Sequence, residues 1–161
     1  MKKVLAAVVV VGAVVVALVY GAGANNAKGP PPVVSHAFHA SAADEATLKA
    51  TFLAYKNKNH EMAVTDKVTW TKVLDNGAVG PLIAYDGLDH HYWALVAFNL
   101  VLPASYRAEV SFQDGGSRGI MKRARAGTWV MTGSPGFPLC AKDVPTVVAK
   151  LWGLNNYPAC A

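Results

Sequence analysis

The stretch HYWALVAFNLVL, residues 91–102, decides the fold of this chain. Successive side chains of a β-strand point to opposite faces of its sheet. One face of this strand would carry Tyr92, Ala94, Val96, Phe98 and Leu100, and the other would carry Trp93, Leu95, Ala97 and Val101. Because both faces are apolar, the pattern predicts a central strand that is covered on both sides or shared with a partner.

A helix is predicted before this strand. Ser41 and Asp44 match a relaxed capping box, so the helix should begin near Ser41 and end at residues 57–59. Lys56 is expected to lie mostly off its apolar face. That face should carry Leu48, Thr51, Phe52 and Tyr55.

The rest of the chain predicts shorter strands and a final helix. Strands are expected at residues 64–74, 79–85, 118–125 and 128–132, the last two as a hairpin, and residues 110–112 could add one brief strand. The last helix should have Asp143 as N-cap, Pro145 in its first turn and Gly153 as a left-handed C-cap. The predicted fold is therefore α+β: one antiparallel sheet of about 4–5 strands, with an N-terminal and a C-terminal helix packed on it.

The N-terminal segment predicts export. Lys2 and Lys3 precede an apolar run, and Ala22-Gly23-Ala24 supplies the small residues that signal peptidase accepts. A signal peptide of residues 1–24 fits this pattern, and so does an uncleaved membrane anchor, because about 20 apolar residues can cross a bilayer. Both predict that the chain from Asn25 onward is secreted or lies on the outer side of the cytoplasmic membrane.

The segment after the leader predicts a spacer and then one domain. Residues 25–40 are predicted to form a Pro-rich flexible tether. Its three consecutive prolines favour extended polyproline geometry over helix or sheet. Residues 41–161 would then form a single α+β domain. Cys140 and Cys160 are the two cysteines, and in an exported chain they favour a disulfide at the C-terminus.

The charge of the chain is mild. The formal net charge is +5, and it falls to +3 once Lys2 and Lys3 are removed with the leader. A value this small fits a soluble extracellular protein with at most weak attraction to an anionic surface, and it does not indicate a nucleic-acid partner.

The densest group of chemically active side chains is Asp86, Asp89, His90 and His91. Two carboxylates and two imidazoles are possible ligands of a divalent metal. However, His90 and His91 are neighbours, and neighbouring strand residues point to opposite faces. The favoured interpretation is therefore a polar hairpin turn. A metal site, or a contact that responds to pH through histidine, remains as an alternative.

A second group is basic: Arg118, Lys122, Arg123 and Arg125. It could bind an anionic partner, or it could be an edge strand whose charges prevent aggregation. The sequence has no nucleophile elbow, phosphate-binding loop, dinucleotide fingerprint, zinc-protease motif or C-x-x-C pair. It therefore predicts no catalytic residue and no cofactor.

The C-terminal half resembles a loose group of uncharacterised small secreted proteins of actinobacteria. The resemblance rests on four segments: the strand Tyr92–Phe98, the stretch Phe112–Gly115, the hairpin sequence Gly127–Val130, and the ending with Cys140, Val144-Pro145 and Trp152–Leu154. These motifs consist of turns, core tryptophans, a disulfide and a capped helix. The resemblance implies an exported, non-catalytic domain and transfers no catalytic residue.

Together these features predict an exported, non-catalytic binding module of the cell envelope or extracellular space, and a secreted inhibitor-like protein is one form that this module could take. Its partner would be an extracellular or envelope protein, or an anionic polymer. The expected contact surfaces are the basic hairpin and the loop around Asp86–His91. Two alternatives are a metal-dependent extracellular hydrolase that uses Asp86–His91, and a membrane-anchored accessory subunit of an envelope complex.

Overall fold

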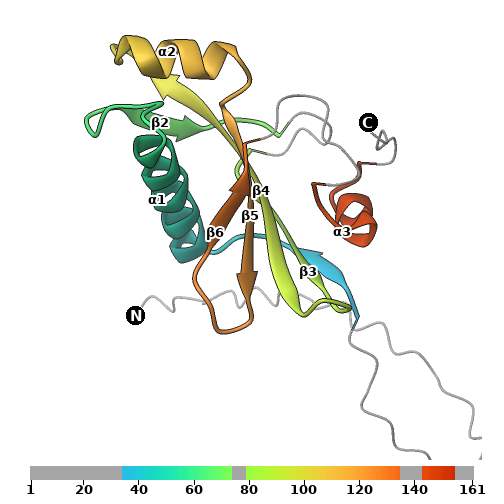
Figure 1. Cartoon of the computed structure of the whole chain (residues 1–161). Coiled ribbons are helices and arrows are strands. Elements are labelled where there is room, and N and C mark those ends of the chain that lie inside the picture. Colours follow the sequence, from blue (N-terminus) through green and yellow to red (C-terminus); the bar gives the residue numbers. More distant parts are fainter. Residues whose placement is uncertain (1–33, 74–78, 135–142, 155–161) are drawn as a thin grey trace, which may run out of the picture. The chain divides into compact units, whose positions relative to one another are not determined.

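The computed structural model describes residues 34–73, 79–134 and 143–154. Its strands and helices, in chain order, are β1 (His36–Phe38), α1 (Ala42–Lys58), β2 (Lys67–Trp70), β3 (Leu82–Asp86), β4 (His91–Val101), α2 (Tyr106–Gln113), β5 (Arg118–Ala124), β6 (Val130–Gly133) and α3 (Thr146–Leu151). Figure 1 shows their arrangement. The predicted leader, most of the predicted tether, and both cysteines with their predicted disulfide lie outside the described residues.

Strand β4 is the centre of the sheet, as its sequence predicts. The strands follow the order β1-β3-β4-β5-β6, and every pairing is antiparallel. Strand β4 is long enough to pair with two strands along one edge: β3 pairs with its residues 91–95, and β2 pairs with its residues 98–101. The described residues thus form one antiparallel sheet of six strands, slightly larger than expected.

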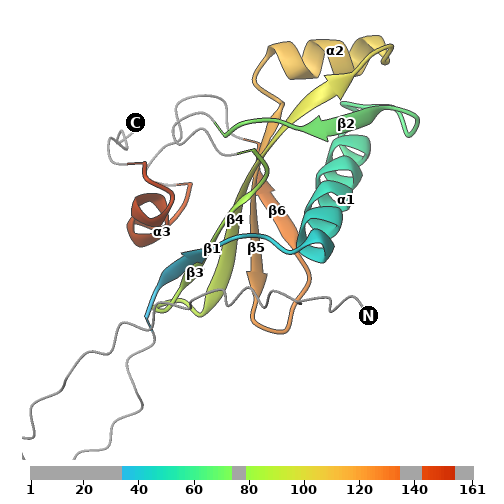
Figure 2. The ribbon, with the colours of Figure 1, turned by 180° about the vertical axis from the view of Figure 1, so that it is seen from behind.

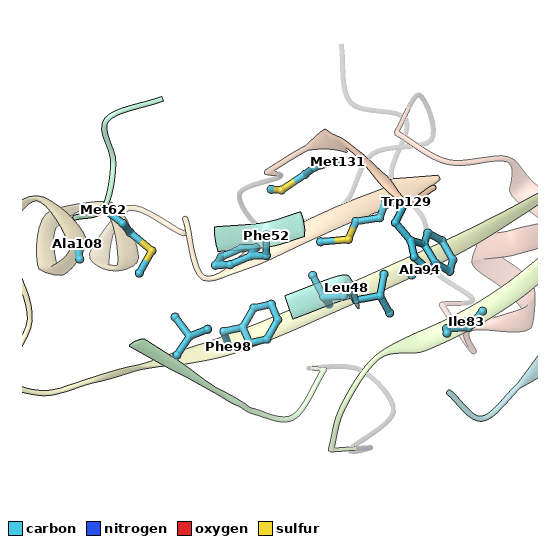
Figure 3. Packing of buried hydrophobic residues seen from close by; sticks show 12 residues of the cluster. Leu48, Phe52, Met62, Ile83, Ala94, Phe98, Ala108, Trp129 and Met131 are labelled. Carbon is cyan, nitrogen blue, oxygen red and sulfur yellow. The ribbon is translucent and has the colours of Figure 1, made fainter. Parts of the chain in front are cut away.

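Helices cover both faces of this sheet. Helix α1 packs on one side, and α3 packs on the other, as Figures 1 and 2 show. On the α1 side, Leu48 and Phe52 contact the sheet beside Phe98, whose ring centre lies 4.5 Å from that of Phe52 (Figure 3). On the α3 side, Trp93 and Leu95 pack with residues of the last helix. The two apolar faces predicted for β4 are therefore both buried.

Helix α1 begins as predicted but buries an unexpected residue. The Ser41 hydroxyl accepts a hydrogen bond from the Asp44 backbone N–H at 3.1 Å, and Asn59 is the C-cap. Lys56 is fully buried, so the expectation that it lies off the apolar face is wrong. Since helical neighbours recur every three or four residues, Lys56 continues the row of Leu48 and Phe52.

Three local predictions differ from the structure. Residues 110–112, predicted as a strand, belong to α2, where the Ser105 hydroxyl accepts from the Ala108 N–H and caps the helix. Helix α3 has Pro145 rather than Asp143 as its N-cap, although Gly153 follows it with φ 78° as expected. Residues 36–38, inside the predicted tether, pair with β3, so the domain begins before Ser41.

A buried carboxylate ties the segment after α1 to the start of α2. Asp66 accepts hydrogen bonds from the Ala63 N–H at 2.6 Å, the Ser105 N–H at 2.8 Å and the Ser105 hydroxyl at 2.5 Å. Burial alone would raise the pKa of Asp66, but these hydrogen bonds outweigh it and lower the pKa.

In the described part of the chain, no helix is long and apolar enough to cross a membrane.

The Asp66→Asn variant is expected to lose about 2 kcal/mol of unfolding free energy at pH 7, because charge-assisted hydrogen bonds from the half-buried N–H groups of Ala63 and Ser105 are lost. A lowered carboxyl pKa stabilises the fold above its ordinary value near 3.9 and loses that contribution as the pH falls through the folded-state pKa. The gap to the wild type should therefore shrink below about pH 4. Urea unfolding at pH 7 and below about pH 4 measures this difference in unfolding free energy, with the exposed Asp114→Asn as control. An equal difference under both conditions would contradict the role given to the Asp66 carboxylate.

Candidate functional site

The Asp86–His91 turn and three of the four basic residues, Lys122, Arg123 and Arg125, lie at one end of the sheet. His91 pairs with Ala124, so the turn between β3 and β4 and the turn between β5 and β6 lie at the same end (Figure 1). The Ser35 hydroxyl accepts a hydrogen bond from the Gly87 N–H at 2.9 Å and brings the start of the domain there too. We name residues 34–36, 86–91 and 122–130 the hairpin end.

The acidic side chains of the first turn mainly hold its backbone. Asp86 is buried and accepts from the Leu88 N–H at 2.9 Å, and Asp89 accepts from the His91 N–H at 2.9 Å. His90 has a left-handed φ of 56°, which residues other than glycine rarely adopt. Its Nδ1 lies 3.1 Å from the hydroxyl oxygen of Tyr85. These contacts are those of a tight polar turn, as the favoured interpretation expects.

The same contacts bear on the metal alternative. Within the described ranges, no group of three or more histidine, cysteine, aspartate or glutamate side chains is placed to hold a metal ion. The carboxylates of Asp86 and Asp89 already accept hydrogen bonds from the backbone, and Asp89 also pairs with Lys122. The geometry of the turn therefore offers no support for a hydrolase built on these four residues.

Two of the basic residues point to opposite faces of β5 and pair there. Lys122 Nζ lies 3.1 Å from Asp89 Oδ2 and 4.8 Å from the ring centre of Trp93. The Arg123 guanidinium lies between the rings of Tyr92 and Trp129, at 4.8 and 4.7 Å, and 3.5 Å from Asp44. Both cations therefore have a carboxylate and an aromatic partner within the domain.

The other two basic residues lie apart. Arg118 begins β5 opposite Ala97, far along the strand from the hairpin end, whereas Arg125 is exposed in the turn before β6. Strand β5 itself lies between β4 and β6, so its interpretation as an edge strand is wrong. The four cations do not form one continuous strip.

The ion pair of Lys122 also fixes the charge of Asp89. Burial alone would raise the pKa of Asp89, but hydrogen bonds from Lys122 and the His91 N–H, with the charge of Lys122, lower it. Asp89 is thus ionised at neutral pH and offsets the charge of Lys122.

Apolar side chains are exposed beside these paired charges. Leu88, at the tip of the β3–β4 turn, is 86% exposed, and Val34 and Val130 are exposed at the same end of the sheet. Arg125, His36 and His90 are exposed at this end as well. The hairpin end therefore exposes both apolar and polar side chains.

The structure also reveals a cluster that the sequence did not predict. At the other end of the sheet, Lys56 Nζ donates to Glu61 Oε2 at 2.5 Å and to the hydroxyls of Ser111 and Ser134 at 3.3 Å each. The Ser111 hydroxyl donates to the same Glu61 oxygen at 2.8 Å. Spacing was the available signal, since Lys56 follows Leu48 and Phe52 at intervals of four.

This cluster forms part of the wall of a cleft of about 650 Å³ between the end of α1 and α2. Tyr106, 80% exposed on the first turn of α2, stands at its edge. Burial alone would raise the pKa of Glu61, but hydrogen bonds from Lys56 and Ser111 and the charge of Lys56 lower it. Glu61 is therefore an ionised acceptor in the cleft at neutral pH.

Comparison with models of protein families, with curated proteins and with solved structures finds no match to this chain.

Proposed function

We propose that the chain is an exported, non-catalytic binding module that docks a protein partner of the envelope or extracellular space through the hairpin end. The observation that carries the proposal is that Leu88, Val34 and Val130 are all exposed at this one end of the sheet, where Arg125 and His90 are exposed as well. Exposed apolar groups with a polar surround are typical of protein contact sites. Leu88 lies on the turn that joins the paired strands β3 and β4, and Val130 begins strand β6, so the sheet holds both residues and keeps the ordering cost of binding low.

A protein partner fits this surface better than an anionic polymer does. Binding to a polyanion depends on unpaired cations and the counterions they displace. At the hairpin end, Lys122 is paired with Asp89, and Arg123 is paired with Asp44. Arg125 is left as the exposed guanidinium among the three, which suits one directed contact at the rim of a protein interface.

The absence of catalysis in this proposal is supported by how the polar groups are used. Ser111 and Ser134 contact Lys56, the arrangement from which a serine–lysine hydrolase could be built. However, Lys56 donates to the Glu61 carboxylate, and an ammonium in such a pair has no lone pair to accept a proton from serine. The cluster therefore suits a structural or binding role.

Export is the second part of the proposal. The leader, whether cleaved after Ala24 or retained as an anchor, would deliver the domain outside the cytoplasm. Cys140 and Cys160 would there form a disulfide worth on the order of 3 kcal/mol. The resemblance to small secreted proteins of actinobacteria agrees with this placement.

Replacing Leu88 by glutamate tests the docking surface. The immobilised domain should capture a partner from an envelope extract of its host, and Leu88→Glu should weaken that capture at least about tenfold, because a charge would be buried at the contact. Val64→Glu is the matched control, because Val64 is 88% exposed and lies in the segment between α1 and β2. It should capture the same protein as the wild type.

Two outcomes would contradict the proposal. One is a captured protein that Leu88→Glu and Val64→Glu retain equally. The other is retention of an anionic wall polymer that disappears at high salt and ignores Leu88→Glu, which would assign the module to a polyanion.

A further inference from the structure

The cleft is lined by residues from the end of α1 and from α2, and Figure 1 shows these two elements meeting at the end of the sheet opposite the hairpin end. Its volume of about 650 Å³ falls within the range of roughly 300–1,000 Å³ that small-molecule sites occupy. Four charged side chains line it: Lys56 and Arg107 are cationic, and Glu61 and Asp114 are anionic. Because these formal charges cancel, the cleft suits a neutral ligand.

The cation at the base of the cleft is already fully used. The ammonium of Lys56 has three N–H donors, and they have three acceptors: Glu61 Oε2 and the hydroxyls of Ser111 and Ser134. The Ser134 hydroxyl in turn donates to the backbone carbonyl of Arg118 at 2.9 Å. An incoming anion would have to break this network, so Lys56 does not serve as an anion site.

One strong acceptor of the network remains. Glu61 receives both of its hydrogen bonds from Lys56 and Ser111 on Oε2, and its Oε1 makes none within the described residues. The Glu61 side chain is 34% exposed and lines the cleft. A carboxylate held by one oxygen is pre-oriented, so its other oxygen can accept a ligand hydroxyl at low entropic cost.

The outer part of the cleft is aromatic and apolar. Tyr106 and Val110 are one turn apart on α2, and Tyr55 comes from the last turns of α1. A tyrosine ring offers a flat apolar surface with a polar tip. Arg107 and Asp114 add a donor and an acceptor at the two ends of α2.

We infer that this cleft binds a neutral, hydroxyl-rich sugar residue of a glycan. The apolar face of the sugar ring lies on Tyr106, and its hydroxyls donate to Glu61 Oε1 and Asp114 and accept from Arg107. The site is separate from the proposed docking surface, and it does not depend on that proposal.

Titration with three neutral trisaccharides, chitotriose, cellotriose and maltotriose, tests the inference on the natively processed protein. At least one should shift the amide NMR signals of α2 and of the end of α1, with a dissociation constant in the range of about 1 mM. Tyr106→Ala should weaken this binding about tenfold or more, through loss of the ring surface. Leu88→Ala, at the hairpin end, should bind as the wild type does.

Asp114→Asn supplies a second test that leaves the buried network intact, since Asp114 is exposed. It should weaken the same trisaccharide several-fold while the amide spectrum stays that of a folded protein. The inference is overturned if none of the three sugars shifts these signals, or if Tyr106→Ala binds as well as the wild type. It is also overturned if inorganic phosphate or tetramethylammonium occupies the cleft more tightly than any of the sugars.

Discussion

Replacement of Glu61 by glutamine should lower the free energy of unfolding by about 3 kcal/mol, because it leaves a buried ammonium without its counter-charge. Lys56 has no exposed side-chain surface, so water cannot take the place of the carboxylate without opening the end of α1. The two serine hydroxyls stay in place, but they are neutral acceptors and cannot neutralise the ammonium. Urea unfolding at neutral pH measures the loss.

The comparison with Lys56→Met separates the charge effect from packing. Methionine fills a similar volume beside Phe52, and the carboxylate that it leaves unpaired is 34% exposed and can reach water. Its cost should therefore be smaller, roughly 1–2 kcal/mol, and Lys56→Met combined with Glu61→Gln should be more stable than Glu61→Gln alone. If Glu61→Gln costs no more than Lys56→Met, the buried pair does not govern stability at this end of the sheet.

Replacement of Gly116 by alanine should destabilise the domain by about 3 kcal/mol, because an added methyl group has no room. A Cβ atom at this position would lie 2.4 Å from the backbone oxygen of Ser111 and 2.7 Å from Lys56 Nζ. The Gly116 N–H donates to that same Ser111 oxygen at 2.9 Å, so the two segments cannot move apart without losing this hydrogen bond. The strain would also displace Ser111 from Lys56 and Glu61.

Gly133→Ala is the matched control for this substitution. No atom lies within 4 Å of a Cβ placed on Gly133, which ends β6. Its unfolding free energy should change by less than about 1 kcal/mol, through the entropy of the unfolded chain. Thermal unfolding of both variants compares their stabilities. Equal unfolding midpoints would contradict the prediction, because they would mean that the backbone after α2 can shift to accommodate the methyl group at little cost.

The sequence predicts best where a pattern is long or chemically specific. The alternation of Trp93 and Leu95 with Ala94 and Val96 extends over a whole strand, so the central place of β4 could be inferred without any tertiary contact. The N-cap of α1 was also predictable, because Ser41 and Asp44 interact locally. In both cases the information lies within a few residues of chain.

The failed predictions depend on short or distant signals. Residues 110–112 are apolar or small, and a pattern of three residues does not distinguish a strand from a helix. The signal for the helix is its N-cap Ser105, which lies five residues before Val110. The position of Lys56 near a helix end predicts a side chain that lies mostly off the apolar face. Its burial requires Ser111 and Ser134, which only the folded chain brings near it.

The sequence predicts the two turns of the hairpin end but not their proximity. The Asp86–His91 turn and the basic hairpin each have a local sequence pattern, whereas their position at one end of the sheet follows from the pairing of His91 with Ala124. The pairing of Arg123 with Asp44 crosses from β5 to α1 and has no local signature. The exposure of Leu88 is a property of the folded chain, and nothing in the local sequence distinguishes it from other turn residues.

The position of β4 also determines how this domain can come apart. Both of its backbone edges are hydrogen-bonded, and its side chains divide between the layer under α1 and the layer under α3. Both layers pack against the same eleven-residue strand. If β4 leaves the sheet, each layer therefore loses the side chains that it packs against. We therefore expect the two layers to be thermodynamically coupled, so that denaturation should proceed as one cooperative transition rather than as two separable ones.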